Sequence, residues 1–106
     1  MGYAKERGKL EQLSEKIVGL AIYSEKSLAI LVDSHEKYSH TIRILKNKEP
    51  EIFSELYTVD LQAVKESRKT LKESENDEIR QSNFLEYKTL IVSVLEKAIA
   101  ATKASL

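Results

Sequence analysis

Residues 10–45 of this 106-residue chain read LEQLSEKIVGLAIYSEKSLAILVDSHEKYSHTIRIL. Apolar side chains recur in this stretch at steps of three and four residues, which places them along one face of an α-helix. The positions in this register are Leu10, Leu13, Ile17, Leu20, Ser24, Leu28, Leu31, His35, Tyr38, Ile42 and Leu45. The phase continues without a slip, so we predict one continuous helix over residues 3–46, on the order of 65 Å long.

The register has one irregularity, because two four-residue steps follow each other around Ser24. A doubled step of this kind is typical of a stutter, where a coiled coil locally unwinds. Gly19 lies close by. Either the helix tolerates this glycine at a cost of about 1 kcal/mol against alanine, or the glycine marks a close helix crossing. The alternative to a continuous helix is a break near Asp33, which has capping-box spacing to Glu36.

The remaining sequence predicts two further helices. Asn47, Lys48 and Glu49 lead to Pro50, which disfavours helix before it and suits the first turn of a new helix. We therefore predict a helix over residues 51–72. No apolar residue occurs between Leu71 and Ile79, and a turn is expected at residues 73–77, with a straight helix through this stretch as the alternative. The last helix, over residues 77–104, has apolar positions at Phe84, Tyr87, Leu90, Ile91, Val94, Leu95, Ala98, Ile99 and Ala101.

These helices predict a single all-α domain over residues 1–106, an elongated antiparallel helical bundle or coiled-coil hairpin. The first stripe is wider than a two-helix layer can cover, so we expect a twofold homodimer that forms a four-helix layer. The candidate self-association seam comprises Leu10, Leu13, Ile17, Leu20, Leu28, Leu31, His35, Tyr38, Ile42 and Leu45. If the first helix breaks near Asp33, the expectation changes to a compact monomeric four-helix bundle of a regulatory or immunity type.

Composition narrows the classes of function. Lysine plus arginine and aspartate plus glutamate each number 17, whereas binding to nucleic acid through phosphates favours a basic excess. The chain has no cysteine, so disulfides, zinc thiolate sites and thiol nucleophiles are excluded. Its apolar runs are too short for a membrane span, and its first residues do not form a signal peptide. A cytoplasmic protein is therefore expected.

The residues that carry metal or acid–base chemistry are sparse. His35 and His40 are five residues apart, unlike the i, i+4 pair of a helical zinc site, and no Glu-x-x-His motif accompanies them. We interpret His35 as a core or interface histidine with one hydrogen bond, or as a pH-sensitive position in the seam. Neither histidine has the neighbours expected of a phosphotransfer bundle. We expect no cofactor, no metal and no enzymatic activity.

One cluster of charge is distinctive. Lys65, Arg68, Lys69 and Lys72 share one helix face and form a candidate basic patch. It is either a solvated face or a site for an acidic partner or an anionic membrane, joined by Arg43, Lys46 and Lys48.

The function predicted from these features is that of a non-enzymatic protein–protein interaction or assembly protein, an adaptor or a chaperone-like bundle. It would act through an apolar helix face and self-association. The alternative is a helical dimer that binds an anionic membrane surface through its basic patch.

Overall fold

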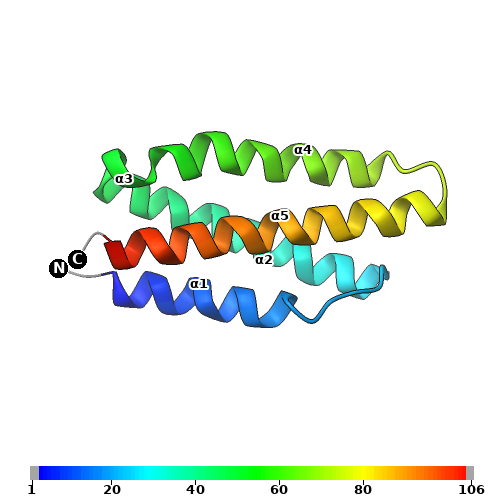
Figure 1. The fold of residues 1–106 in the computed structure, drawn as a ribbon, viewed down its shortest axis with the longest axis horizontal. Coiled ribbons are helices and arrows are strands. Elements are labelled where there is room, and N and C mark those ends of the chain that lie inside the picture. Colours follow the sequence, from blue (N-terminus) through cyan, green and yellow to red (C-terminus); the bar gives the residue numbers. More distant parts are fainter. Residues whose placement is uncertain (1–2, 105–106) are drawn as a thin grey trace.

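In the computed structural model, which describes residues 3–104, the chain forms an all-α bundle of four long helices (Figure 1). These are α1 (Ala4–Ile17), α2 (Glu25–Lys48), α4 (Leu61–Lys72) and α5 (Asp77–Ala104). A short helix, α3 (Pro50–Glu55), and a π-helical turn, η1 (Leu56–Asp60), connect α2 to α4. The bundle measures 47 × 23 × 17 Å, and α5 runs along its whole length. The predicted all-α class and antiparallel bundle are confirmed.

The predicted continuous helix over residues 3–46 is wrong. The chain leaves the helix after Ile17 and forms a new helix from Glu25, so that α2 folds back along α1. Ser24 caps the new helix, since its Oγ accepts a hydrogen bond from the backbone N–H of Ser27 at 3.0 Å. A break near Asp33 is also wrong, because Asp33 lies inside α2. The four helices of the bundle therefore come from one chain.

Contacts from α5 hold the connection between α1 and α2 in place. The Gln81 side chain accepts a hydrogen bond from the Tyr23 backbone N–H at 2.7 Å and donates one to the Ala21 carbonyl at 2.7 Å. The Tyr23 ring packs edge-on against Phe84, with their centroids 5.8 Å apart. Since Gln81 satisfies two backbone groups that a helix would have paired, it stabilises the break directly.

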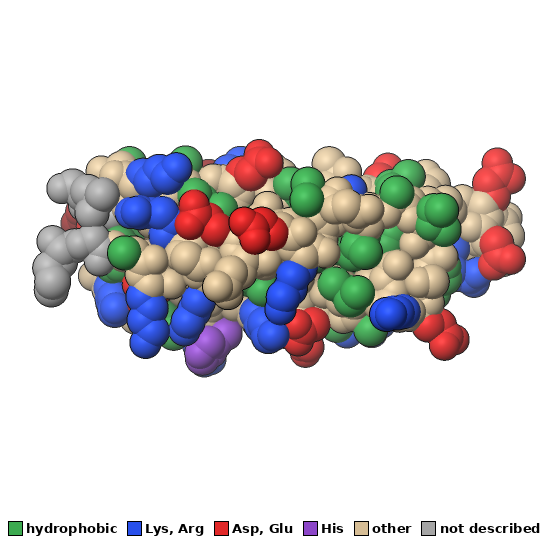
Figure 2. All heavy atoms as spheres, turned by 90° about the horizontal axis from the view of Figure 1, so that it is seen from below, with side chains coloured by type: hydrophobic (Ala, Val, Ile, Leu, Met, Phe, Trp, Pro, Cys, Tyr) green, Lys and Arg blue, Asp and Glu red, His purple; other side chains and the backbone are tan. Residues whose placement is uncertain are grey.

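Gly19 lies in this connection, where it follows the last turn of α1. A Cβ placed on it would meet no atom within 4 Å, so the interpretation as a close helix crossing is wrong. Val18 and Ile22 are exposed to 58% and 75% on either side of it. Figure 2 shows the face of the molecule on the α1 side, where hydrophobic side chains gather toward the end opposite the termini. The sequence predicts local unwinding around Gly19 and Ser24. In the structure the helix is interrupted completely there.

The outer ends of the remaining helices agree with the sequence, although the helix predicted over residues 51–72 is divided into α3, η1 and α4. Pro50 is the first residue of α3, and the turn expected at residues 73–77 separates α4 from α5. Asn76 caps the N-terminus of α5, because its Oδ1 accepts a hydrogen bond from the Ile79 N–H at 2.8 Å. The alternative of a straight helix through residues 73–77 is therefore wrong.

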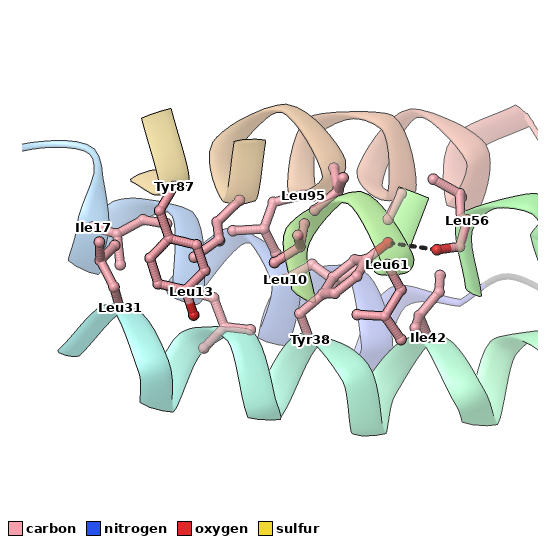
Figure 3. Packing of buried hydrophobic residues seen from close by; sticks show 14 of the residues in the cluster. Leu10, Leu13, Ile17, Leu31, Tyr38, Ile42, Leu56, Leu61, Tyr87 and Leu95 are labelled. Atoms are coloured by element: carbon pink, nitrogen blue, oxygen red, sulfur yellow. Dashed lines mark hydrogen bonds between the residues drawn. The ribbon is translucent and has the colours of Figure 1, made fainter. Parts of the chain in front are cut away.

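The core contains the stripe that dominates the sequence. Of the ten seam residues, eight are buried, and Leu20 and Leu28 are half-buried. Figure 3 shows several of them packed against residues of the other helices, including Tyr87 and Leu95 of α5 and Leu61 of α4. In the same cluster the Tyr38 hydroxyl donates to the Leu56 carbonyl at 3.3 Å, which ties α2 to η1. The chain covers the stripe by itself, so its width no longer requires a second copy.

Candidate anion-binding site

A groove lies between α2 and α4, the two neighbouring helices that pack least closely. Helix α2 packs against α1, α3, η1 and α5, and α4 packs mainly against α5 and η1. Direct packing of α2 on α4 is slight, and a hollow of about 530 Å³ lies between their facing side chains. It is lined by His35, Glu36 and Ser39 of α2 and by Lys65, Arg68, Lys69 and Lys72 of α4. The structure thus places the whole predicted basic patch in one concave site, which we call the basic groove.

The charge of the basic groove is not neutralised by the chain itself. Within residues 3–104, none of its four cationic side chains forms an ion pair, and Glu36 is the one carboxylate in its lining. Lys65 and Lys69, like Arg68 and Lys72, are four residues apart on α4, where like charges repel each other by about 0.2–0.5 kcal/mol per pair. An arrangement of this kind favours a bound anion over the empty groove.

Arg68 occupies a position on α4 where an apolar side chain is expected. Leu61, Val64 and Leu71 are buried at steps that continue through residue 68, so this position faces the core. The arginine there is half-buried, and its Nε is fully buried with no hydrogen-bond partner among the described residues. Burying such a donor without a partner costs about 1–3 kcal/mol. An arginine at a core-facing position that also lines a hollow makes Arg68 a candidate functional residue.

His35 is the counterpart of Arg68 on α2. It lies in the register of the apolar stripe, and it is 5% exposed on the floor of the basic groove. Its Nδ1 is 2.8 Å from the hydroxyl of Tyr87, which reaches it from α5. The core histidine with one hydrogen bond that the sequence predicts is confirmed. His35 and Arg68, two polar side chains at positions that continue apolar stripes, therefore line the same hollow from two different helices.

The surroundings keep His35 neutral. Burial, with the charges of Arg68 and Lys65 adding to it, lowers the pKa of His35 to about 4. Burial also raises the pKa of the Tyr87 phenol, so Tyr87 keeps its proton. If this phenol donates to Nδ1, both groups are satisfied, whereas in the reverse arrangement the buried phenol proton has no acceptor. We therefore assign the histidine proton to Nε2, which has no partner among residues 3–104.

The other cations suggested for this site lie elsewhere. Lys48 approaches Glu6 of α1 at 3.7 Å, and the Lys46 ammonium lies 4.7 Å from the ring centroid of Tyr57. Neither residue lines the basic groove, and Arg43 does not line it either. The cations of the basic groove are therefore the four α4 residues, and Arg43, Lys46 and Lys48 of α2 do not belong to it.

His40 is exposed and lies in a different hollow, between α1 and α2. The part of the chain that the structure describes holds no cluster of three histidine or acidic side chains suited to a metal ion. Across that same part, no helix combines the length and apolar character that crossing a bilayer requires.

Comparison with known proteins gives no match: no family model, no curated protein and no solved structure resembles the chain significantly.

Two polar residues of the site stand in apolar registers that are visible in the sequence, although we predict burial only for His35. Arg68 continues the three-and-four spacing of Leu61, Val64 and Leu71, and a charged residue in such a register is unusual. His35 does the same in the first stripe. The pairing of the two across the bundle depends on how α2 and α4 are placed, which no local pattern encodes.

Proposed function

We propose that this protein is a non-enzymatic interaction protein that binds an acidic segment of a partner protein along the basic groove. The observation that carries this proposal is the set of four cations around one hollow, unpaired within residues 3–104 and opposed by a single carboxylate. The expected apolar interaction face does not serve this role, because its residues form the core.

The shape of the groove favours a protein segment over a membrane surface. His35, on the floor, is 5% exposed, whereas Lys65, Lys69 and Lys72 are exposed at the rim. An extended or helical segment can enter such a groove and place carboxylates between the two helices. A flat bilayer surface reaches the rim lysines without filling the hollow. The membrane-binding alternative from the sequence is therefore the competing outcome of the test.

The test is a fluorescence anisotropy titration with a labelled oligoglutamate peptide at low and moderate salt. We expect the wild-type chain to bind and the affinity to fall as salt rises, because the attraction is screened. The triple variant Lys65→Gln, Lys69→Gln, Lys72→Gln is expected to bind roughly 3- to 150-fold more weakly, since each exposed charge contributes roughly 0.2–1 kcal/mol.

A matched control removes the same charge from another face. Lys9, Lys16 and Lys26 are exposed, lie on α1 and at the start of α2, and form no ion pair within residues 3–104. The variant with these three lysines changed to glutamine should bind the peptide as the wild type does. Equal losses in both variants would mean that net charge, and not the groove, governs binding. Co-sedimentation with phosphatidylserine vesicles without peptide binding would favour the membrane alternative.

A further inference from the structure

The floor of the basic groove has more donors than a chain of carboxylates requires. Three kinds of donor line it: the Arg68 guanidinium, the Nε2–H assigned to His35, and the ammonium groups of Lys65 and Lys69. We propose that this floor is a phosphate site, which takes a phosphorylated serine or threonine of the bound segment. This inference rests on the proposed function, because it names the feature of the acidic segment that the groove selects.

The types of donor in this set are those that bind phosphate groups. A guanidinium presents parallel N–H groups that bind two phosphate oxygens at once, and charge-assisted bonds of this kind are the stronger hydrogen bonds in proteins. A neutral imidazole with its proton on Nε2 donates to a third oxygen without the repulsion that a charged histidine would feel beside Arg68. The Tyr87 hydroxyl fixes the orientation of that ring from behind.

The charge also matches. Four cations and the carboxylate of Glu36 line the groove, which leaves an excess of positive charge. A phosphomonoester carries about −1.5 to −2 at neutral pH, against −1 for one carboxylate, so it neutralises this excess at a single point. The hollow of about 530 Å³ lies within the range of roughly 300–1,000 Å³ that is typical of small-ligand sites.

A phosphorylated side chain fits the site better than a membrane headgroup. The innermost donors belong to His35 and the half-buried Arg68, between two helices that flank them along the groove. A phosphoserine on an extended segment can project its phosphate down to this level. A bilayer that lies across the rim lysines keeps its phosphates at the level of Lys69 and Lys72, away from the floor.

The experiment compares three short synthetic peptides that share one acidic sequence and differ at the central residue, which is serine, aspartate or phosphoserine. Isothermal titration calorimetry with the full chain measures each affinity. We expect the phosphoserine peptide to bind at least about tenfold more tightly than the aspartate peptide, because one charge-assisted bond is worth about 1.5–3 kcal/mol. Inorganic phosphate should shift the NMR signals of the His35 ring and leave those of His40 unchanged.

Two variants locate the effect. Arg68→Lys keeps the charge and removes the planar fork, so it should abolish most of the preference for phosphoserine over aspartate while the aspartate peptide still binds. Lys69→Gln, at an exposed position that folding does not require, should weaken the phosphoserine peptide more than the serine peptide. The variant lacking Lys9, Lys16 and Lys26 should keep the full preference.

The outcomes separate this inference from the proposed function. Equal affinity for the aspartate and phosphoserine peptides would overturn the phosphate site and leave acidic-segment binding intact. Binding of inorganic phosphate at His35 with no binding of any peptide would overturn both the proposed function and the phosphoserine inference, and leave a site for free phosphate alone. A preference for phosphoserine that persists unchanged in Arg68→Lys and Lys69→Gln would place the phosphate elsewhere and refute the inference. Binding of phosphatidylinositol phosphate vesicles without binding of the phosphopeptide would refute it as well.

Discussion

Acid should weaken the bundle through His35. The folded chain holds this histidine neutral with a pKa of about 4, against an ordinary value of 6.5. Between these two pH values the unfolded chain binds a proton that the folded chain does not. The free energy of unfolding therefore decreases as the pH falls from 6.5 toward 4, and the contribution of His35 is fully present only above 6.5.

The size of this effect follows from the two pKa values. Their difference corresponds to about 3 kcal/mol at 1.36 kcal/mol per unit. The basic groove is open to water, and the charges of Lys65 and Arg68 on α4 are screened there, so we expect about half of this value, roughly 1–2 kcal/mol. The Glu36 carboxylate on α2 and the Tyr87 phenol on α5 complete the surroundings of the ring.

Urea unfolding followed by helical circular dichroism measures this effect between about pH 7 and pH 4 in a phosphate-free buffer. The wild-type chain is compared with His35→Gln and with His40→Gln, which changes an exposed histidine. Carboxylates titrate in all three proteins, so the difference between wild type and His35→Gln isolates His35. His40→Gln should follow the wild type.

Parallel pH dependence in wild type and His35→Gln would refute the reasoning. So would an NMR titration in which the His35 ring takes up its proton near its ordinary pKa of 6.5. Tyr87→Phe provides a second check, because it leaves Nδ1 of His35 without its partner. This variant should be less stable than wild type by about 1–3 kcal/mol at neutral pH.

Three further predictions follow from the connection between α1 and α2. Gln81→Ala removes two hydrogen bonds to the backbone of this connection and should lower the free energy of unfolding by about 1–2 kcal/mol in urea. Gly19→Ala should leave stability unchanged or raise it by about 0.4–1 kcal/mol, since a Cβ has open space there; a clear loss would restore the close-crossing interpretation. Sedimentation equilibrium at micromolar concentration should give the 12.1 kDa mass of one chain, because the stripe is covered within the monomer; a stable dimer would contradict this.

The sequence predicted the helix boundaries correctly where a residue with one strong local preference marks them. Pro50 cannot continue a helix but suits its first turn, and it begins α3 as expected. Asn76 follows a polar stretch, and its side chain caps α5. In both places the local chemistry and the end of the apolar pattern agree, so short-range information was sufficient.

The break after Ile17 was missed because the apolar spacing continues across it. Leu20 and Leu28 stay in phase and both pack against the core, although they lie on opposite sides of a chain reversal. The informative residues were Gly19, which follows the end of α1, and Ser24, which is a preferred N-cap. The irregular spacing around Ser24 by itself predicts only a local unwinding of one helix. Periodicity alone does not distinguish a long helix from two helices that both face one core.

The candidate site was half predictable for a related reason. The spacing of Lys65, Arg68, Lys69 and Lys72 places them on one side of a helix whatever the tertiary fold. Their position opposite His35 depends on the chain reversal between α1 and α2. This reversal lets a single chain supply all four helices of the bundle. The sequence could therefore predict the cations but not the hollow, its depth or its histidine.

The chain reversal also explains why the groove is basic instead of apolar. Once α1 folds back, α2 packs against α1, α3, η1 and α5, and its side near α4 is packed less closely. Helix α4 rests mainly on α5, so position 68 faces both the core and the hollow. An arginine fits such a position because its aliphatic stem packs inward while its head reaches water or a ligand. His35, with its ring held by Tyr87, occupies the corresponding position on α2. His35 and Arg68, which stand at positions that continue the two apolar registers, are thus residues that line the basic groove, where the proposed anion would contact them.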